Sequence, residues 1–122
     1  MAVTNTSLPA LASTFLFTDT VSANAAIPVK ASSATLYAID VDNTANASAS
    51  YTKIWNVASG SVVVGTTVPD MIIMVPASTR VSIPIPAGVV FGTALSEATV
   101  TTAGTAGTTS PSSSVIVRLV YV

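Results

Sequence analysis

Residues 35–56 (TLYAIDVDNTANASASYTKIWN) constrain the fold of this chain more than any other stretch. The first part alternates between two sides of an extended chain, with Tyr37, Ile39 and Val41 on one side and Asp40 and Asp42 on the other. A period of two residues is typical of a β-strand that buries one face. The small polar residues 43–50 predict a loop, and a second alternation follows at Tyr51, Lys53 and Trp55. The simplest structure for this stretch is a β-hairpin with a long connection.

Short strand patterns recur along the rest of the chain, broken by Pro, Gly, Ser and Thr. We expect strands or extended segments near residues 15–18, 23–30, 62–64, 71–75, 80–86, 89–91, 99–102 and 115–122. Residues 94–98 (ALSEA) predict one helical turn, and residues 103–114 predict a loop. Roughly eight short strands with so little helix predict an all-β fold, a β-sandwich, with a jelly roll as one arrangement of it.

Prolines indicate where several of these strands lie in their sheets. Because proline lacks an N–H, Pro28 excludes a central position, and Pro84 and Pro86 predict an edge strand. Residues 71–75 (MIIMV) are apolar throughout, which predicts a strand that is buried on both faces or covered by a partner chain. The closing strand, residues 115–122 (VIVRLVYV), should be paired into a sheet, with residues 115, 117, 119 and 121 on one face and residues 116, 118, 120 and 122 on the other.

The chain divides into an N-terminal part and a β-sandwich domain. Residues 1–33 hold an extended arm and the first strand, and residues 34–122 form the sandwich. The arm, residues 1–13, is dominated by Ser, Thr and Ala, so it cannot build a core of its own. Leu8, Leu11 and Phe15 give it apolar anchors, and we expect it to dock on the sheet of a neighbouring chain. Folding back on its own domain is the alternative.

Composition excludes several classes of protein. The 122 residues include no Cys and no His, which removes disulfides, thiolate metal sites and the usual catalytic triads. A net charge of −1 offers no basic surface to nucleic acid. No run approaches the roughly 18 apolar residues of a membrane-spanning helix, and the N-terminus lacks the basic segment of a secretory signal. We therefore expect no nucleic-acid partner, no membrane insertion and no signal peptide.

Two acidic residues are candidates for chemistry. Asp40 and Asp42 share one face of a predicted strand, about 7 Å apart, and glycosidases use paired carboxylates. The same residues resemble the start of a calcium-binding loop, but Ala45 and Tyr51 stand where that loop requires Gly and Glu. A solvated strand face is the simpler interpretation, so we expect no catalytic, cofactor or metal site.

Aromatic residues offer a second candidate site. Trp55, Tyr37 and Tyr51 could line a sugar-binding face if they are exposed, or they could form a cluster in the core. Because the chain has few aromatic residues, a core cluster is the prediction.

Low charge has two explanations that can both hold: Ser and Thr hydroxyls solvate the surface, or partner chains cover much of it. Charged residues make up 7% of the chain, against roughly 25% in an average soluble domain, so a free monomer would be poorly protected against association. We expect a homo-oligomer, with a trimer as the first choice. The expected contacts come from the arm and from the apolar strand: Leu8, Leu11, Phe15, Met71, Ile72, Ile73 and Met74.

Four segments of the sequence resemble one protein family. They are LYAIDVDNTANASASYTKIWN, VGTTVPDMIIMVPAS, PIPAGVVFGTALSEATVTTAGTAGTTSP and SSVIVRLVYV, which fall within residues 34–122. These segments resemble small β-rich structural proteins of tailed bacteriophages that infect aquatic bacteria. The resemblance implies a non-enzymatic component of the virion, and it transfers no catalytic residues.

The resemblance also implies partners and a place of action. The partners would be the major capsid protein or other virion proteins, and the place would be the virion, assembled in the host cytoplasm. The first hypothesis is a capsid decoration or cement protein. The alternatives are a tail or fibre subunit and a glycan- or receptor-binding β-sandwich. Exposed aromatic residues would favour glycan binding, whereas buried Trp55 and Tyr51 would favour the first hypothesis.

Overall fold

Eight strands assemble into two antiparallel four-stranded sheets, which confirms the all-β class. The computed structural model describes residues 14–122. The elements are β1 (Phe15–Ser22), β2 (Ile27–Lys30), β3 (Ala34–Asp42), β4 (Ser50–Trp55), the short 3-10 helix η1 (Ser59–Ser61), β5 (Met71–Val75), β6 (Arg80–Phe91), β7 (Leu95–Val100) and β8 (Val115–Tyr121).

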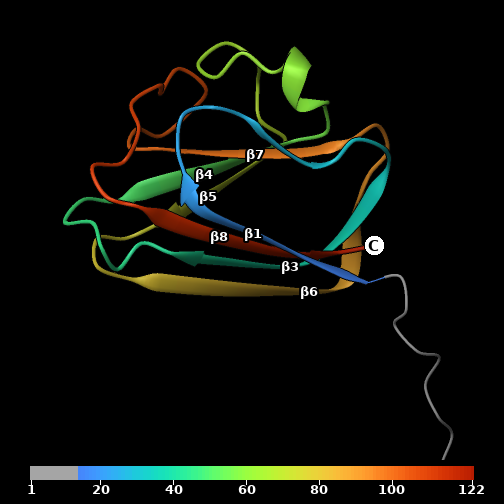
Figure 1. Cartoon of the computed structure of the whole chain (residues 1–122), viewed down its shortest axis with the longest axis horizontal. Coiled ribbons are helices and arrows are strands. Elements are labelled where there is room, and N and C mark those ends of the chain that lie inside the picture. The colour runs from blue at the N-terminus through green and yellow to red at the C-terminus, as the bar shows by residue number, and fades with distance from the viewer. Residues whose placement is uncertain (1–13) are drawn as a thin grey trace, which may run out of the picture.

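The two sheets form the two layers of a sandwich (Figure 1). One sheet has the strand order β1-β8-β3-β6, and the other has the order β2-β7-β4-β5. Only β4 and β5 are consecutive in the chain and also neighbours in a sheet. Every other connection crosses from one sheet to the other, so each layer is built from strands that are distant in sequence.

The predicted hairpin of residues 35–56 is wrong, although its two strands exist. β3 lies between β8 and β6 in one sheet, whereas β4 lies between β7 and β5 in the other. The polar connection crosses between the layers, and Asn43 at its start holds it there. The Asn43 side-chain amide donates to the carbonyls of Ser48 and Pro76, each at 3.0 Å. These bonds tie the loop to the start of the β5–β6 connection.

A bulge in β3 changes which residues face the core. The pairing of β3 with β6 and with β8 shifts register between Leu36 and Ala38. As a result Leu36 is buried, while Tyr37, predicted to share a face with Ile39 and Val41, is 37% exposed. Gly88 of β6 lies close to the bulge with a positive φ of 73°, and a Cβ there would come within 2.9 Å of the Tyr37 ring. Glycine is therefore required at this position.

The hydrophobic core fills the space between the layers. Val115, Val117 and Leu119 of β8 are fully buried, while the alternate residues of that strand are only partly buried. This alternation matches the prediction for the closing strand. Reciprocal backbone hydrogen bonds between Thr35 and Val122, at 3.1 and 3.0 Å, continue the pairing beyond β8.

Two local predictions fail because tertiary packing overrides local preference. Residues 94–98 do not form a helical turn: they enter β7, all six residues of which are buried. Residues 62–64 do not form a strand, and they follow η1 in the long loop between β4 and β5.

The prolines correctly predicted two edge strands. β2, with Pro28, ends one sheet, and β6, with Pro84 and Pro86, ends the other. The predicted burial of residues 71–75 on both faces is wrong within this chain. β5 is also an edge strand, and it buries Ile73 and Val75 on one face only.

The first two strands belong to the sandwich. β1 pairs with β8 and β2 pairs with β7, so each completes one of the sheets. The boundary expected between residues 33 and 34 therefore does not divide the sheets. The predicted arm, residues 1–13 with Leu8 and Leu11, lies outside the described residues.

Candidate functional site

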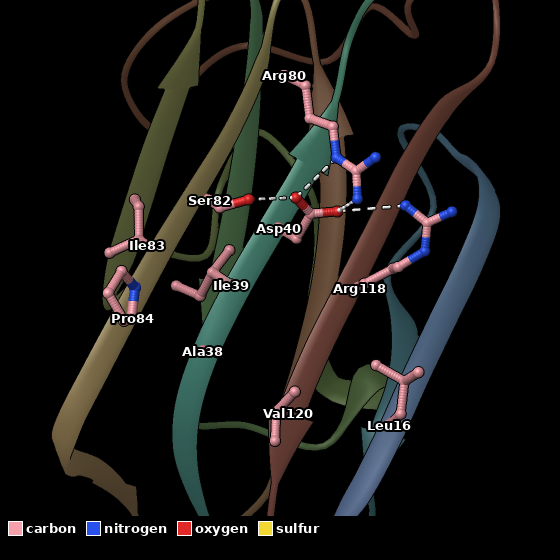
Figure 2. A pocket seen from close by; sticks show the side chains of 10 residues that line it. All are labelled: Leu16, Ala38, Ile39, Asp40, Arg80, Ser82, Ile83, Pro84, Arg118 and Val120. Atoms are coloured by element: carbon pink, nitrogen blue, oxygen red, sulfur yellow. Dashed lines mark hydrogen bonds and ion pairs between the residues drawn. The ribbon is translucent and has the colours of Figure 1, made fainter.

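The outer face of the β1-β8-β3-β6 sheet carries an apolar row across all four strands. Strand register places Leu16 opposite Val120, Val120 opposite Ala38, and Ala38 opposite Pro84. Leu16 is 65% exposed, so this row faces solvent. Together with the charged residues beside it, the row lines a shallow hollow of about 450 Å³ (Figure 2).

A charged trio, made of Asp40, Arg80 and Arg118, lies next to this row, with Asp40 at its centre (Figure 2). The Arg80 Nε and Nη2 atoms donate to the two Asp40 carboxylate oxygens, each at 2.9 Å. Arg118 Nη1 donates to Asp40 Oδ2 at 3.2 Å, and Ser82 Oγ donates to Oδ1 at 2.6 Å. The trio comes from three adjacent strands: register places Arg118 opposite Asp40, and it places Arg80 opposite Asp42, two residues further along β3.

The electrostatics of the trio make Asp40 a poor acid or base. The bidentate hydrogen bond from Arg80, offset in part by desolvation, holds the pKa of the Asp40 carboxyl below its ordinary value. Asp42 lies opposite Arg80 in the neighbouring strand and interacts electrostatically with both arginines, so two carboxylates balance two guanidinium groups beside the apolar row. The hollow therefore suits a partner surface that presents apolar side chains together with polar groups that pair with these fixed charges.

Asp40 and Asp42 do not act together. The Asp42 carboxylate accepts hydrogen bonds from the Thr44 hydroxyl at 2.6 Å and the Thr44 N–H at 3.0 Å, and these bonds lower the pKa of Asp42. Within residues 14–122, no group of three or more acidic side chains is placed to hold a metal ion. The two carboxylates thus accept hydrogen bonds from different donors, and this arrangement gives no support to a paired-carboxylate or a calcium site.

Removing the central charge should cost little stability. We expect Asp40→Asn to lower the melting temperature by a few degrees at low salt, because both arginines lie near the surface and exposed ion pairs are weak. Since the pKa of Asp40 is lowered in the fold, its contribution is present at neutral pH and is lost as pH falls through the folded pKa. Thermal melts at low and high salt test this, and high salt should reduce the difference. A difference that grows with salt would contradict it.

The other sheet presents a different outer face, which two long loops cover. Residues 56–70, with η1, and residues 101–114 lie outside the β2-β7-β4-β5 layer (Figure 1). Buried polar side chains tie the loops down. Trp55 Nε1 donates to the Thr67 carbonyl at 3.0 Å, and Ser96 Oγ donates to the Val57 carbonyl at 2.8 Å.

Lys53 is the polar anchor of the second loop. Its side chain is fully buried, and its ammonium group donates to the carbonyls of Thr105 and Gly107, both at 2.9 Å. Burial lowers the pKa of the Lys53 ammonium group from its ordinary value. Sequence reasoning assigned no role to Lys53. Its position between Tyr51 and Trp55 on one face of a strand was the available signal, because it indicated a covered face.

Glu97 is a second buried ionisable group that sequence reasoning missed. It faces the space between the layers and is fully buried, with Oε2 accepting from Ser22 Oγ at 2.7 Å. Within residues 14–122, Oε1 has no hydrogen-bond donor. Desolvation, reinforced by the neighbouring Asp19 carboxyl, raises the pKa of Glu97 to about 8.

The described contact residues predicted from sequence lie in two separate places. Phe15 is 53% exposed at the start of β1, where its ring stacks on Tyr121 with centroids 5.6 Å apart. In β5, Ile72 and Met74 are 40% and 53% exposed, whereas Ile73 is buried and Met71 is partly buried against the core. The structure does not bring Phe15 and β5 together: β1 and β5 belong to different sheets.

The aromatic residues do not form a sugar-binding platform. Trp55 is fully buried and its indole N–H is used by Thr67. Tyr37 and Tyr51 belong to strands of different sheets, and Tyr51 is only partly exposed. The predicted core cluster of these three residues is wrong, because Tyr37 is exposed and Tyr51 is only partly buried. Burial of Trp55 favours a structural role over glycan binding, whereas Tyr51 does not meet that criterion in full.

Comparison of the chain with protein-family models, with curated proteins and with solved structures found no match. Among residues 14–122, no helix has the length and apolarity needed to cross a membrane.

Proposed function

We propose that this chain is a non-enzymatic structural protein of a tailed-phage virion, a capsid decoration protein that works as a homo-oligomer. It docks on the capsid through the outer face of the β1-β8-β3-β6 sheet. The major capsid protein is its partner, and the virion is where it acts.

The contrast between the two outer faces carries this proposal. The loops 56–70 and 101–114 cover one face through buried polar anchors, whereas the other face leaves the apolar row and the charged trio open. Exposed apolar residues beside fixed charges are typical of surfaces that bind another protein. Stability alone does not require this face to be apolar, so a covering partner is the simplest reason for Leu16 to be there.

The strand order supports the same class of protein. Sheets ordered β1-β8-β3-β6 and β2-β7-β4-β5, with one hairpin between β4 and β5, suit an eight-stranded jelly roll. Viral capsid domains use that architecture, and so do lectins. Because a fold does not assign a function, the strand order adds weight only together with the open face and the resemblance to phage proteins.

The chemistry of the ionisable groups supports a non-enzymatic role. The chain contains no His and no Cys, and Asp40 is committed to two arginines. The alternative within the same class is a tail or fibre subunit, which would use the same open face against a different partner.

Binding to particles tests the proposal. Particles that lack this chain should bind the purified protein in a co-sedimentation assay. Leu16→Glu, which places a charge in the apolar row, should weaken that binding at least about tenfold, since a buried unpaired carboxylate is costly. Val68→Glu is the matched control, because Val68 is 73% exposed in the loop over the opposite face. Equal binding by both variants, or no binding by the unmodified protein, would contradict the proposal.

A further inference from the structure

The four edge strands of the sandwich differ in how they are protected against pairing. Edge strands expose unpaired backbone groups, and monomeric proteins block them with charges, prolines or bulges. Three of the four edges have such features. β2 carries Pro28 and Lys30, and β6 carries Arg80, Pro84 and Pro86. β1 carries Asp19 and a register shift that follows it.

β5 has none of these protections. Its sequence is MIIMV, without a charge, a proline or a glycine. Its pairing with β4 runs without a shift from Ser50 opposite Val75 to Ile54 opposite Met71. Within residues 14–122, β4 is the only strand paired with β5. The free side of β5 is therefore a regular, uninterrupted edge of the kind that accepts another strand.

The side chains of β5 are apolar on both faces of the sheet. Ile73 and Val75 face inward and join the core. Ile72 and Met74 face outward, where they are 40% and 53% exposed. Register places Met74 opposite Tyr51, so exposed apolar surface continues from β5 onto β4. The loops that cover Lys53 and Trp55 leave this strip open.

We propose that β5 pairs antiparallel with β5 of a second copy of this chain and joins two β2-β7-β4-β5 sheets into one continuous sheet. This inference rests on the proposed role as a self-associating structural protein and identifies the contact. A twofold axis perpendicular to the sheet, midway between the two Ile73 residues, keeps the inner and outer faces of the two sheets aligned. It places Ile72 opposite the partner's Met74 and Ile73 opposite the partner's Ile73.

A second copy fits this edge better than an unrelated strand for two reasons. Every position of β5 is apolar, so self-pairing matches apolar side chains with apolar side chains on both faces. In the part of the chain that the structure describes, one edge is unprotected, so pairing closes after two copies instead of growing into a fibre. The contact therefore predicts a dimer, in contrast to the trimer expected from composition.

Sedimentation velocity over a concentration series tests the dimer. The unmodified chain should sediment as a monomer–dimer equilibrium. Ile72→Lys and Met74→Lys should each raise the dissociation constant at least about tenfold, because lysine on an edge strand opposes pairing. Val90→Lys is the matched control, because Val90 is 73% exposed on the edge strand β6. Circular dichroism should show the same β fold in all variants, since each changed side chain faces solvent.

Cysteine cross-linking tests the geometry. The chain has no Cys, so the variant with both Ile72→Cys and Met74→Cys carries the only thiols. Opposite residues in an antiparallel pair have Cα atoms about 4.5–5.5 Å apart, within the range of a disulfide. Mild oxidation should yield a covalent dimer, and Val90→Cys should not.

The outcomes separate this contact from the proposed function. A trimer, a monomer at every concentration, or a dimer that persists in both lysine variants would overturn pairing through β5. A chain that is found on particles but does not dimerise through β5 overturns this inference and leaves the virion role standing. A chain that dimerises through β5 but is absent from particles would support this inference and overturn the proposed virion role.

Discussion

The free energy of unfolding should fall by on the order of 5 kcal/mol as pH rises from about 4.5 to about 8. Glu97 is the cause, because burial raises its pKa to about 8 in the fold against 4.5 when it is exposed. Between these values the folded chain holds a proton that the unfolded chain has released. Stability is therefore greatest below pH 4.5 as far as this group is concerned, and it declines until Glu97 ionises in the fold.

The surroundings of Glu97 explain why its charged form is unfavourable. Ser22 Oγ donates to the carboxyl at 2.7 Å, which favours the ionised form, but the loss of solvent around the buried group outweighs this bond. The one charged group near it is another carboxyl, Asp19, and both ion pairs within residues 14–122 belong to Asp40. An ionised Glu97 would thus be buried without a cation to balance it.

Composition makes this experiment clean. With no His and no Cys, few other side chains titrate between pH 5 and 8. Denaturant unfolding at a series of pH values measures the slope. Glu97→Gln should flatten it, because Gln keeps the acceptor for Ser22 and cannot ionise. Asp19 raises the pKa of Glu97, so Asp19→Asn should lower that pKa. The pH at which stability stops declining should therefore shift to a lower value. The same slope in the unmodified chain and in Glu97→Gln would refute this account.

Lys53→Met should destabilise the fold by about 3 kcal/mol, because two buried carbonyl groups lose a charged hydrogen-bond donor. Methionine preserves most of the aliphatic stem, so the change isolates the ammonium group. The loss of stability should be largest in the loop that Lys53 anchors. Hydrogen exchange should speed up most in residues 101–110, since Thr105 and Gly107 hold that loop against β4.

Lys30→Met is the matched control for that change. Lys30 is the other lysine of the chain and lies partly exposed on the edge strand β2. Its replacement should change stability by less than about 0.5 kcal/mol, as is usual for surface substitutions. Equal effects of the two changes, or unchanged exchange in the loop, would mean that Lys53 does not anchor it.

Strand positions were largely predictable from sequence because alternation and proline are local signals. The alternation of β8 predicted which residues share a face, and the prolines of β2 and β6 predicted their edge positions. Which strands pair with one another was harder to predict from the sequence. The hairpin expected for residues 35–56 failed because the loop after Asn43 crosses between layers, and that depends on contacts with the distant β5–β6 connection. Residues 94–98, which lead into β7, were predicted to form a helical turn because Ala, Leu and Glu favour helix when packing is ignored.

The candidate site could not be assembled from sequence for a related reason. Asp40 was noticed as half of an acidic pair with Asp42, but its real partners are 40 and 78 residues away. Only the register of three strands brings Arg80 and Arg118 beside it. By contrast, the apolar composition of residues 71–75 was visible at once. The sequence alone did not show that β5 is an edge strand with one face exposed, which the structure shows.

Imaging intact particles encoded by the same genome tests the central claim most directly. Single-particle cryo-electron microscopy should find this sandwich on the outside of the capsid. The β1-β8-β3-β6 sheet should face the shell, and the loops 56–70 and 101–114 should point away from it. Density in the tail would move the chain to the alternative position. Absence of the chain from purified particles, or a sandwich with its loop-covered face against the shell, would contradict the account.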